Sequence, residues 1–244
     1  MDRRFWILAA LLCLSTPLWA RELIVVFAED YAPVSFVDHG ELIGVGVDLV
    51  KAMAAREGIS VVLKGLPWVR AQSEVRSGEA DAFVCTDNPE RESYAVLSAA
   101  ALFSVHVMAV TAKNNPRLGE LRAIRTFADA AQYPQVNLLG SGLSGLLGDA
   151  RVCYLANAQS VFEFLLLGRA DLYLDSDLNL SYNAARLHLL GQLEFLPPVF
   201  QVTAFRLGIS KHSPFVSDLP RWSRDFEAME NDGTVAAVLA KFQN

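Results

Sequence analysis

The sequence predicts an α/β fold built from two similar lobes, and two observations carry this prediction. Strand-like and helix-like apolar spacings alternate along the chain. In addition, the segment Gly78–Asp87 is echoed by Gly168–Asp177, which matches it in the Gly, the Ala and both Asp positions. Each copy predicts a helix that stops at Gly, a buried strand, and a polar loop at the strand's carboxyl end, where α/β sheets bind ligands. Because Gly-x-Ala-Asp is also a common helix-to-strand turn, coincidence is the alternative.

The first part of the chain predicts the order β-loop-β-helix-β-helix-β. Its strand-like runs are rich in Val and Ile, and its first helix ends at Gly58. Asn88 and Pro89 are residue types preferred at the N-cap and first turn of a helix, so a further helix is expected there. The other expected segments are Glu22–Ala28, Val34–Val37, Val47–Glu57, Ile59–Lys64, Pro67–Ser77 and Ala80–Cys85.

The second part alternates in the same way. Phe103–Ala112 is a strand-like run without Gly or Pro, and Thr126 is a residue type that caps a short helix. The last helical region is broken at Asp232-Gly233. The expected strands are Val136–Leu139, Arg151–Leu155, Asp171–Leu174 and Val199–Ser210, and the expected helical stretches are Ser160–Leu167, Leu178–Leu189 and Val216–Phe242.

Composition excludes several classes of function. The chain has 244 residues, 52% of them hydrophobic, which is enough for one large domain or two small ones. The net charge of −6 argues against a nucleic-acid partner. We find no zinc-type cysteine spacing, phosphate-binding glycine loop or zinc-protease motif, and the four histidines are scattered. No metal site and no cofactor are therefore expected.

The amino terminus predicts a secretory signal. Arg3 and Arg4 form a basic start, and Phe5–Leu14 is an apolar run too short to span a bilayer. A Pro and small residues follow, so we expect residues 1–20 to be a signal peptide that is cleaved near Ala20. An uncleaved membrane anchor is the alternative.

Cleavage would leave two cysteines, Cys85 and Cys153. An exported compartment permits a disulfide. Since the two cysteines lie in different predicted lobes, a bridge would restrain lobe motion. We therefore expect free, partly buried thiols, with a disulfide as the alternative.

Eight short motifs also stand in a fixed order along the chain. They are Tyr31–Pro33 with Phe36, Gly44–Leu49, Gly78–Asp81, Pro89–Arg91, Gly140–Gly142, Gly168–Asp171, Leu207–Lys211 and Asp232–Thr234. In this order they resemble the bacterial extracellular solute-binding proteins of family 3, the amino-acid-binding type that feeds ABC importers. The resemblance covers nearly all of the chain beyond residue 20.

The resemblance implies a two-lobe periplasmic binding protein type II fold. Each lobe is then a sheet flanked by helices, and two crossing strands near His106–Val110 and Val202–Arg206 join the lobes. Lobe 1 would comprise residues 21–106 and 205–244, and lobe 2 residues 107–204.

The function that the resemblance implies is binding rather than catalysis. A monomeric periplasmic protein would capture a small polar solute, an amino acid or related compound, and deliver it to the permease of an ABC importer. One alternative is a periplasmic enzyme, because cyclohexadienyl dehydratases resemble this family; Glu29 or Asp175 would then be its acid or base. Another alternative is a sensing module for a membrane partner. The segment Leu66–Ala71 resembles a branch of the family whose ligands are less clearly amino acids.

Arg91 is the first candidate for ligand binding. It follows Pro89 at a predicted helix start, and an Arg there can hold a carboxylate through two parallel hydrogen bonds. In the family this Arg grips the ligand's α-carboxylate, Thr86 is the equivalent of a neighbouring donor, and Tyr31 packs on the ligand. The alternative for Arg91 is a surface ion pair with Glu90 or Glu92.

The remaining candidates come from both lobes. Trp68 would line the wall opposite Tyr31, with a buried Trp as the alternative. Arg70 would add a second positive charge to the cleft, with a solvated helix face as the alternative. Ser141 and Gly142 would supply hydroxyl and backbone donors. The family places an acid after the second echo strand to pair with the ligand ammonium, a role open to Asp175 or Asp177; the alternative for either is a helix cap.

Overall fold

A mixed sheet of nine strands runs through the part of the chain that the computed structural model describes, residues 21–147 and 151–242. The predicted signal peptide lies outside these residues. The strand order is β10 (Val152–Leu155), β9 (Gln135–Leu138), β11 (Leu172–Ser176), β8 (Phe103–Ala112), β12 (Leu193–Ser210), β6 (Ala82–Thr86), β1 (Leu23–Ala28) and β5 (Val61–Leu66), with β7 (Ala95–Leu97) paired to β12.

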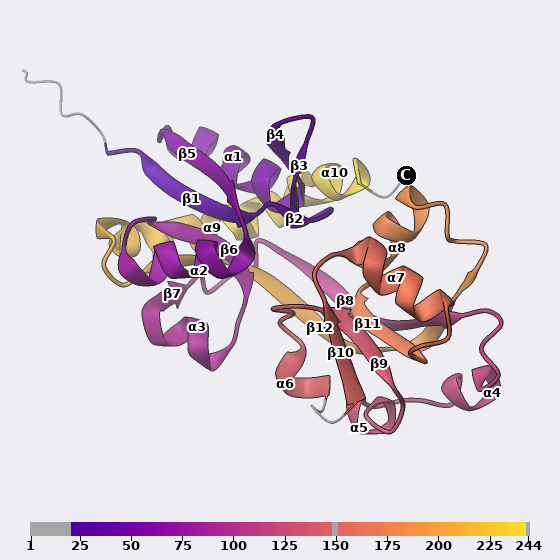
Figure 1. The fold of residues 1–244 in the computed structure, drawn as a ribbon. Coiled ribbons are helices and arrows are strands. Elements are labelled where there is room, and N and C mark those ends of the chain that lie inside the picture. Colours follow the sequence, from indigo (N-terminus) through magenta and orange to yellow (C-terminus); the bar gives the residue numbers. More distant parts are fainter. Residues whose placement is uncertain (1–20, 148–150, 243–244) are drawn as a thin grey trace, which may run out of the picture.

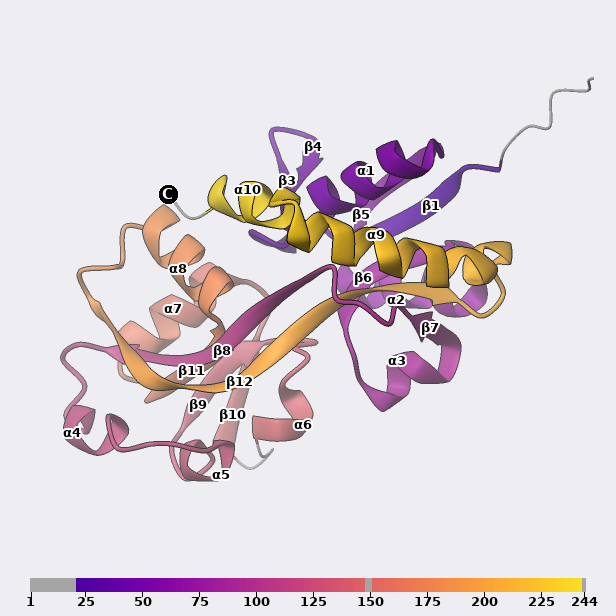
Figure 2. The same ribbon diagram turned by 180° about the vertical axis from the view of Figure 1, so that it is seen from behind.

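The two central strands, β8 and β12, connect the two halves of this sheet. They run side by side and antiparallel between the two groups of helices (Figures 1 and 2). Beyond them, β12 pairs with β6 on one side and β8 pairs with β11 on the other. The two-lobe α/β prediction is therefore confirmed, and His106 and Val202, from the two expected crossings, are register partners. The lobe boundaries given above stay a prediction.

The lobe that contains β1 has helices on both faces of its sheet. Side chains alternate along the strands: Val25 and Phe27 of β1 face one core, and Val26 faces the other. Helices α1 (Val45–Glu57), α9 (Leu219–Asn231) and α10 (Thr234–Ala240) cover the first face, and α2 (Trp68–Ser77) and α3 (Pro89–Tyr94) cover the second.

The other lobe repeats this arrangement. Tyr173 of β11 packs on one side, while Leu172 and Leu174 pack on the other. The first side is covered by α7 (Ala158–Leu166) and α8 (Asp177–Arg186), and the second by α4 (Leu118–Leu121), α5 (Phe127–Ala130) and α6 (Ser144–Leu147).

The echoed glycines both end helices in the left-handed conformation. The φ angle is 82° at Gly78 and 68° at Gly168, values that only Gly adopts without strain. The Asp three residues later immediately precedes each strand. The Asp81 amide donates to Ile24 O of β1, and the Asp171 amide donates to Pro134 O just before β9. The echo thus marks two equivalent helix-to-strand units, each pinned to the neighbouring parallel strand.

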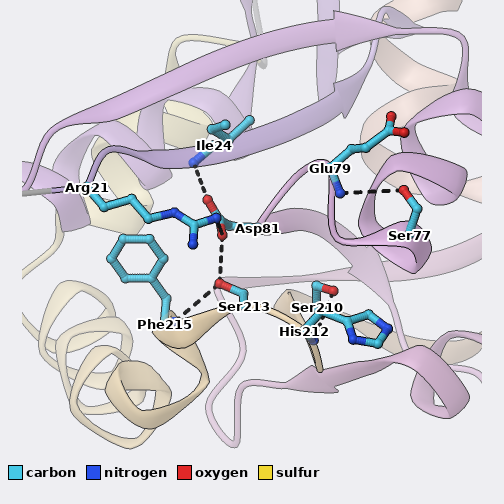
Figure 3. Close-up of polar contacts among 9 residues, drawn as sticks. All are labelled: Arg21, Ile24, Ser77, Glu79, Asp81, Ser210, His212, Ser213 and Phe215. Carbon is cyan, nitrogen blue, oxygen red and sulfur yellow. Dashed lines mark hydrogen bonds and ion pairs between the residues drawn. The ribbon is translucent and has the colours of Figure 1, made fainter.

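The two echoed carboxylates differ in burial and partners. Asp81 is only 1% exposed and accepts hydrogen bonds from the Ile24 amide, Ser213 Oγ and Arg21 Nη2 at 3.0, 2.8 and 3.0 Å (Figure 3). Asp171 instead accepts from two side chains near the start of α4, namely Asn115 and Arg117. Asp81 therefore ties the first strand to the segment after β12.

Two predicted elements differ from the structure. Strand β12 starts at Leu193 rather than Val199, because Leu193–Leu196 pair with β8 before an irregularity. Pro197 and Pro198 interrupt the sequence signal there, since Pro cannot donate to a ladder. The helix expected to reach Leu189 ends at Arg186.

The first loop forms a small sheet of β2 (Asp30–Tyr31), β3 (Ser35–Asp38) and β4 (Glu41–Ile43), and a short 3-10 helix spans Pro214–Asp218. As expected, Cys85 and Cys153 are unbridged. Among the described residues, no helix is long and apolar enough to cross a membrane. The same residues hold no group of three or more His, Cys, Asp or Glu side chains suited to a metal ion.

Candidate functional site

A cavity of about 470 Å³ lies between the lobes, at the carboxyl ends of strands from both of them. Lobe 1 contributes residues that follow β1 and β6, and lobe 2 contributes residues that follow β9 together with the end of β11. Seven of the nine predicted ligand-binding residues line it: Tyr31, Trp68, Thr86, Arg91, Ser141, Gly142 and Asp175.

Arg91 is held rigidly in the cavity wall. It is only 4% exposed, and its Nη1 donates to Thr86 O and Thr86 Oγ1 at 2.8 and 2.7 Å. Its Nε donates to Gln72 Oε1 at 3.3 Å, and its guanidinium lies 5.2 Å from the centre of the Trp68 ring. Among the described contacts none uses Nη2. Arg91 is therefore a fixed, buried positive charge rather than a surface partner of Glu90 or Glu92.

The local sequence explains how Arg91 is placed. Asn88 caps α3 by accepting from the Arg91 amide at 2.8 Å, and Pro89 occupies the first turn, as predicted. Gln72 lies one helical turn after Trp68 on α2, so both side chains reach the same side of the helix. Sequence reasoning missed Gln72, although this spacing from Trp68 is a signal that could have found it.

The Gly140–Gly142 loop of lobe 2 lies directly over this part of lobe 1. A Cβ at Gly140 would stand 3.4 Å from Trp68 Cδ1, and a Cβ at Gly142 would stand 2.8 Å from Thr86 Oγ1. A side chain at position 142 would therefore collide with the hydroxyl that holds Arg91. The loop can close over the cavity only because Gly142 has no side chain.

On the opposite wall, Asp175 is the centre of a hydrogen-bond network. Its Oδ1 accepts from Tyr31 Oη at 2.9 Å and from the Ser176 amide at 2.7 Å, and its Oδ2 accepts from Tyr173 Oη at 2.7 Å. Burial raises the pKa of Asp175, while these hydrogen bonds lower it. Burial and the nearby Asp175 carboxylate raise the pKa of Tyr31 well above its usual value. Tyr31 therefore remains a neutral donor that links the two lobes.

A second polar contact between the lobes lies next to this network. The buried amide groups of Asn179 and Asn183 on α8 both donate to Ala32 O, at 2.8 and 2.9 Å. Their common acceptor belongs to the same loop as Tyr31. Helix α8 thus holds the first loop of lobe 1 in place through buried side chains.

The two other predicted residues, Arg70 and Asp177, do not line the cavity. Arg70 donates to the largely buried Glu74 on α2, and 68% of the Arg70 side chain is exposed. Asp177 is the first residue of α8 and contacts His106, and the cap of that helix is Ser176. Glu29, a candidate acid or base, does not line the cavity either.

Three further charged residues line the cavity and were not predicted from the sequence. Asp30 and Asp87 are both exposed by surface area, but the Asp30 carboxyl is partly enclosed by the surrounding protein, and this partial desolvation raises its pKa. Arg206 donates to Ser98 O and Ala99 O. Asp87 is the last residue of the first echo, so the rule that polar loops follow these strands could have identified it.

A model of the bacterial extracellular solute-binding proteins, family 3, matches residues 23–244. The chain belongs to this family. Membership confirms the resemblance and supports a solute-binding role for the protein. No curated protein matches the sequence in a direct comparison.

Several solved structures share the fold of this chain at low sequence identity. A mutant of ArgBP from T. maritima has a TM-score of 0.73 at 19% identity, over 91% of this chain and 94% of that one. A histidine kinase sensor domain with similarity to periplasmic binding proteins has a TM-score of 0.77 at 17% identity, over 91% and 96%. The ancestral amino acid-binding protein AncCDT-1, a precursor of cyclohexadienyl dehydratase, has a TM-score of 0.70 at 22% identity, over 91% and 96%.

Proposed function

We propose that the protein captures a small solute with a carboxylate group, an amino acid or a related compound, in the cavity between its lobes. The observation that carries this proposal is Arg91: a buried guanidinium, fixed by Thr86 and Gln72, in the cavity wall. A buried charge is costly unless it is paired. A ligand carboxylate would complete the hydrogen bonding of this guanidinium in a charge-assisted contact.

Closure would accompany binding. The walls come from both lobes, so a solute can touch Arg91 and the Gly140–Gly142 loop together only when the lobes are shut. A ligand that prefers the shut form shifts the population towards it. The two crossing strands that join the lobes would act as the hinge for this closure.

The partner we propose is the permease of an ABC importer, with the mature monomer acting in the periplasm after cleavage near Ala20. Family membership supports this role. The likeness to a kinase sensor domain favours a second candidate, in which the shut form signals to a membrane protein. An enzyme on this fold has less support, because Glu29 is outside the cavity and the Asp175 carboxylate is already bonded to Tyr31, Tyr173 and Ser176.

The test is a thermal-shift screen of the mature protein against amino acids, polyamines and small organic acids. A ligand at a hundredfold excess over its dissociation constant adds about 2.7 kcal/mol to the free energy of unfolding. We expect hits only among compounds with a carboxylate. Calorimetry should then show that Arg91→Ala loses on the order of 2–5 kcal/mol of binding free energy.

The matched control is Arg224→Ala, which removes an exposed guanidinium that contacts Pro220 O on α9, away from the cavity. It should bind as tightly as the unchanged protein. Equal affinity of the Arg91 and Arg224 variants would contradict the proposed role of Arg91. A pull-down from membranes of the producing cell separates import from sensing: recovery of an ABC permease would support import, and recovery of a membrane-bound kinase would support sensing.

A further inference from the structure

Asp175 is the only buried carboxylate among the described residues that line the cavity. The other two acids in the lining, Asp30 and Asp87, are exposed. An ammonium group on a ligand forms a strong ion pair only where both charges leave water, whereas an exposed pair contributes about 0–1 kcal/mol. Whether the cavity can bind an ammonium group strongly therefore depends on whether Asp175 is free to accept its hydrogen bonds.

The Asp175 oxygen that contacts Tyr31 already has both of its acceptor sites filled. Oδ1 lies beside Tyr31, which lines the cavity, and it accepts two hydrogen bonds, from Tyr31 Oη and the Ser176 amide. A carboxylate oxygen has two acceptor sites. An ammonium group could bond Oδ1 only by displacing one of these donors, and either donor would then lose its partner.

The second oxygen of Asp175 is turned towards the core. Oδ2 accepts from Tyr173, whose side chain is completely buried, and Tyr173 also contacts the buried Asn179. A ligand in the cavity cannot reach Oδ2 without opening the packing around these side chains. Both oxygens are thus committed to the protein's own donors.

The rest of the lining favours an apolar body on the ligand. The walls include the apolar side chains of Val34, Val84, Val105, Val107, Leu138 and Phe205. Gln201 and Thr203, which also line the cavity, are bonded to each other. The apolar side chains offer no acceptor for an ammonium group. Moving an unpaired ammonium group from water into such surroundings costs several kcal/mol.

We infer that the cavity selects small carboxylic acids with an apolar body and no α-ammonium group, in preference to the matching amino acids. This inference rests on the proposed function, because it takes Arg91 as the carboxylate anchor. In this arrangement Asp175 is a positioning residue, which orients Tyr31 and joins the lobes. The ligand's only charged contact in the buried part of the cavity is with Arg91.

The experiment uses pairs of compounds that differ only in the α-amino group. Suitable pairs are 3-phenylpropanoate with L-phenylalanine and 4-methylpentanoate with L-leucine. The dissociation constant of each compound is measured by calorimetry on the mature protein. We expect the acid of a pair to bind at least about tenfold more tightly than its amino acid, the factor that corresponds to one unmet buried polar group.

Two variants test the reason for this preference. Tyr31→Phe keeps the ring but frees one acceptor site on Oδ1, so it should shift the affinity ratio towards the amino acid by about fivefold or more. The matched control is Tyr182→Phe, since Tyr182 packs between Phe36 and Phe242 and lies outside the cavity lining. It should leave the ratio unchanged. Asp175→Asn should change both affinities of a pair by the same factor.

Each result separates the inference from the function on which it rests. Tighter binding of the amino acids, lost in Arg91→Ala, would overturn the inference and leave the proposed function standing. A selective loss of amino-acid binding in Asp175→Asn would also overturn it, because Asp175 would then hold the ammonium group. Binding that is the same in Arg91→Ala would overturn both. No binding of either pair would overturn the inference, and no binding of any carboxylate in the screen would also overturn the proposed function.

Discussion

Replacing Asp81 by Ala should destabilise the protein far more than the same change at its echo, Asp171. Asp81 is 1% exposed and accepts from the Ile24 amide and Ser213 Oγ, with a further contact from Arg21. Hydrogen bonds to a charged group contribute about 1.5–3 kcal/mol each. The Arg21 side chain is 57% exposed, so its ion pair adds about 0–1 kcal/mol. We therefore expect Asp81→Ala to lower the free energy of unfolding by about 4 kcal/mol.

The echoed residue provides the matched comparison. Asp171 has 16% of its side chain exposed, and its partners are the side chains of Asn115 and Arg117, the latter 50% exposed. No backbone amide loses its acceptor when this carboxylate is removed, as far as the described contacts show. Asp171→Ala should therefore cost only about 1–2 kcal/mol.

Urea unfolding followed by circular dichroism measures both changes at one pH. Asp81→Asn, which keeps one acceptor oxygen, should fall between Asp81→Ala and the unchanged protein. Equal losses of unfolding free energy in Asp81→Ala and Asp171→Ala would show that the burial of Asp81 and its bond to the Ile24 amide add no stability, which would refute the prediction.

Three further predictions concern the cavity, a thiol and acid stability. Gly142→Ala should weaken binding of the best carboxylate from the screen by about tenfold in calorimetry, because the new Cβ would stand 2.8 Å from Thr86 Oγ1. In the control Gly145→Ala the new Cβ would meet nothing within 4 Å, so binding should be unchanged. Burial raises the pKa of Cys85 to about 12, so iodoacetamide at pH 8 should label the half-buried Cys153 first by mass spectrometry; faster labelling of Cys85 would contradict this. Hydrogen bonds from Thr234 and Arg56 lower the pKa of Asp232 from 3.8 to about 2, so its stabilising contribution is present above pH 4 and is lost as the pH falls towards 2. Unfolding curves of Asp232→Asn and the unchanged protein should then differ at pH 6 and converge near pH 2.

The fold could be predicted from the sequence because its signals are local. Gly58, Gly78 and Gly168 end helices in the left-handed conformation, and Asn88 caps α3, as their residue types predict. The strand β12 was predicted less well. Its first part is short, apolar and followed by two prolines, and only its pairing with β8 makes it a strand.

Part of the site could also be predicted, because some of its contacts join residues that are close in the sequence. Arg91 and Thr86 lie five residues apart, and their contact follows from one loop. Arg70 was placed wrongly on the cavity wall by its nearness in sequence to Trp68, although two residues turn a helix by more than half a revolution. The bond between Tyr31 and Asp175 joins residues 144 apart, and no local pattern predicts it.

The irregularity in β12 has a mechanical consequence. Leu196 pairs with Ala109 and Gln201 pairs with Val107. Between these two pairs β12 has four residues, whereas β8 has only one. The residue of β8 at this level is Met108, whose partner on its other side is Asp175. The pairing of β12 with β8 is thus divided into two parts by an unpaired segment of β12. Pro197 and Pro198 lie in this segment, and neither has a backbone amide hydrogen to donate. A bend of β12 between Leu196 and Gln201 breaks none of its pairs with β8, so we expect the sheet to bend more easily at the level of the cavity than within either paired part.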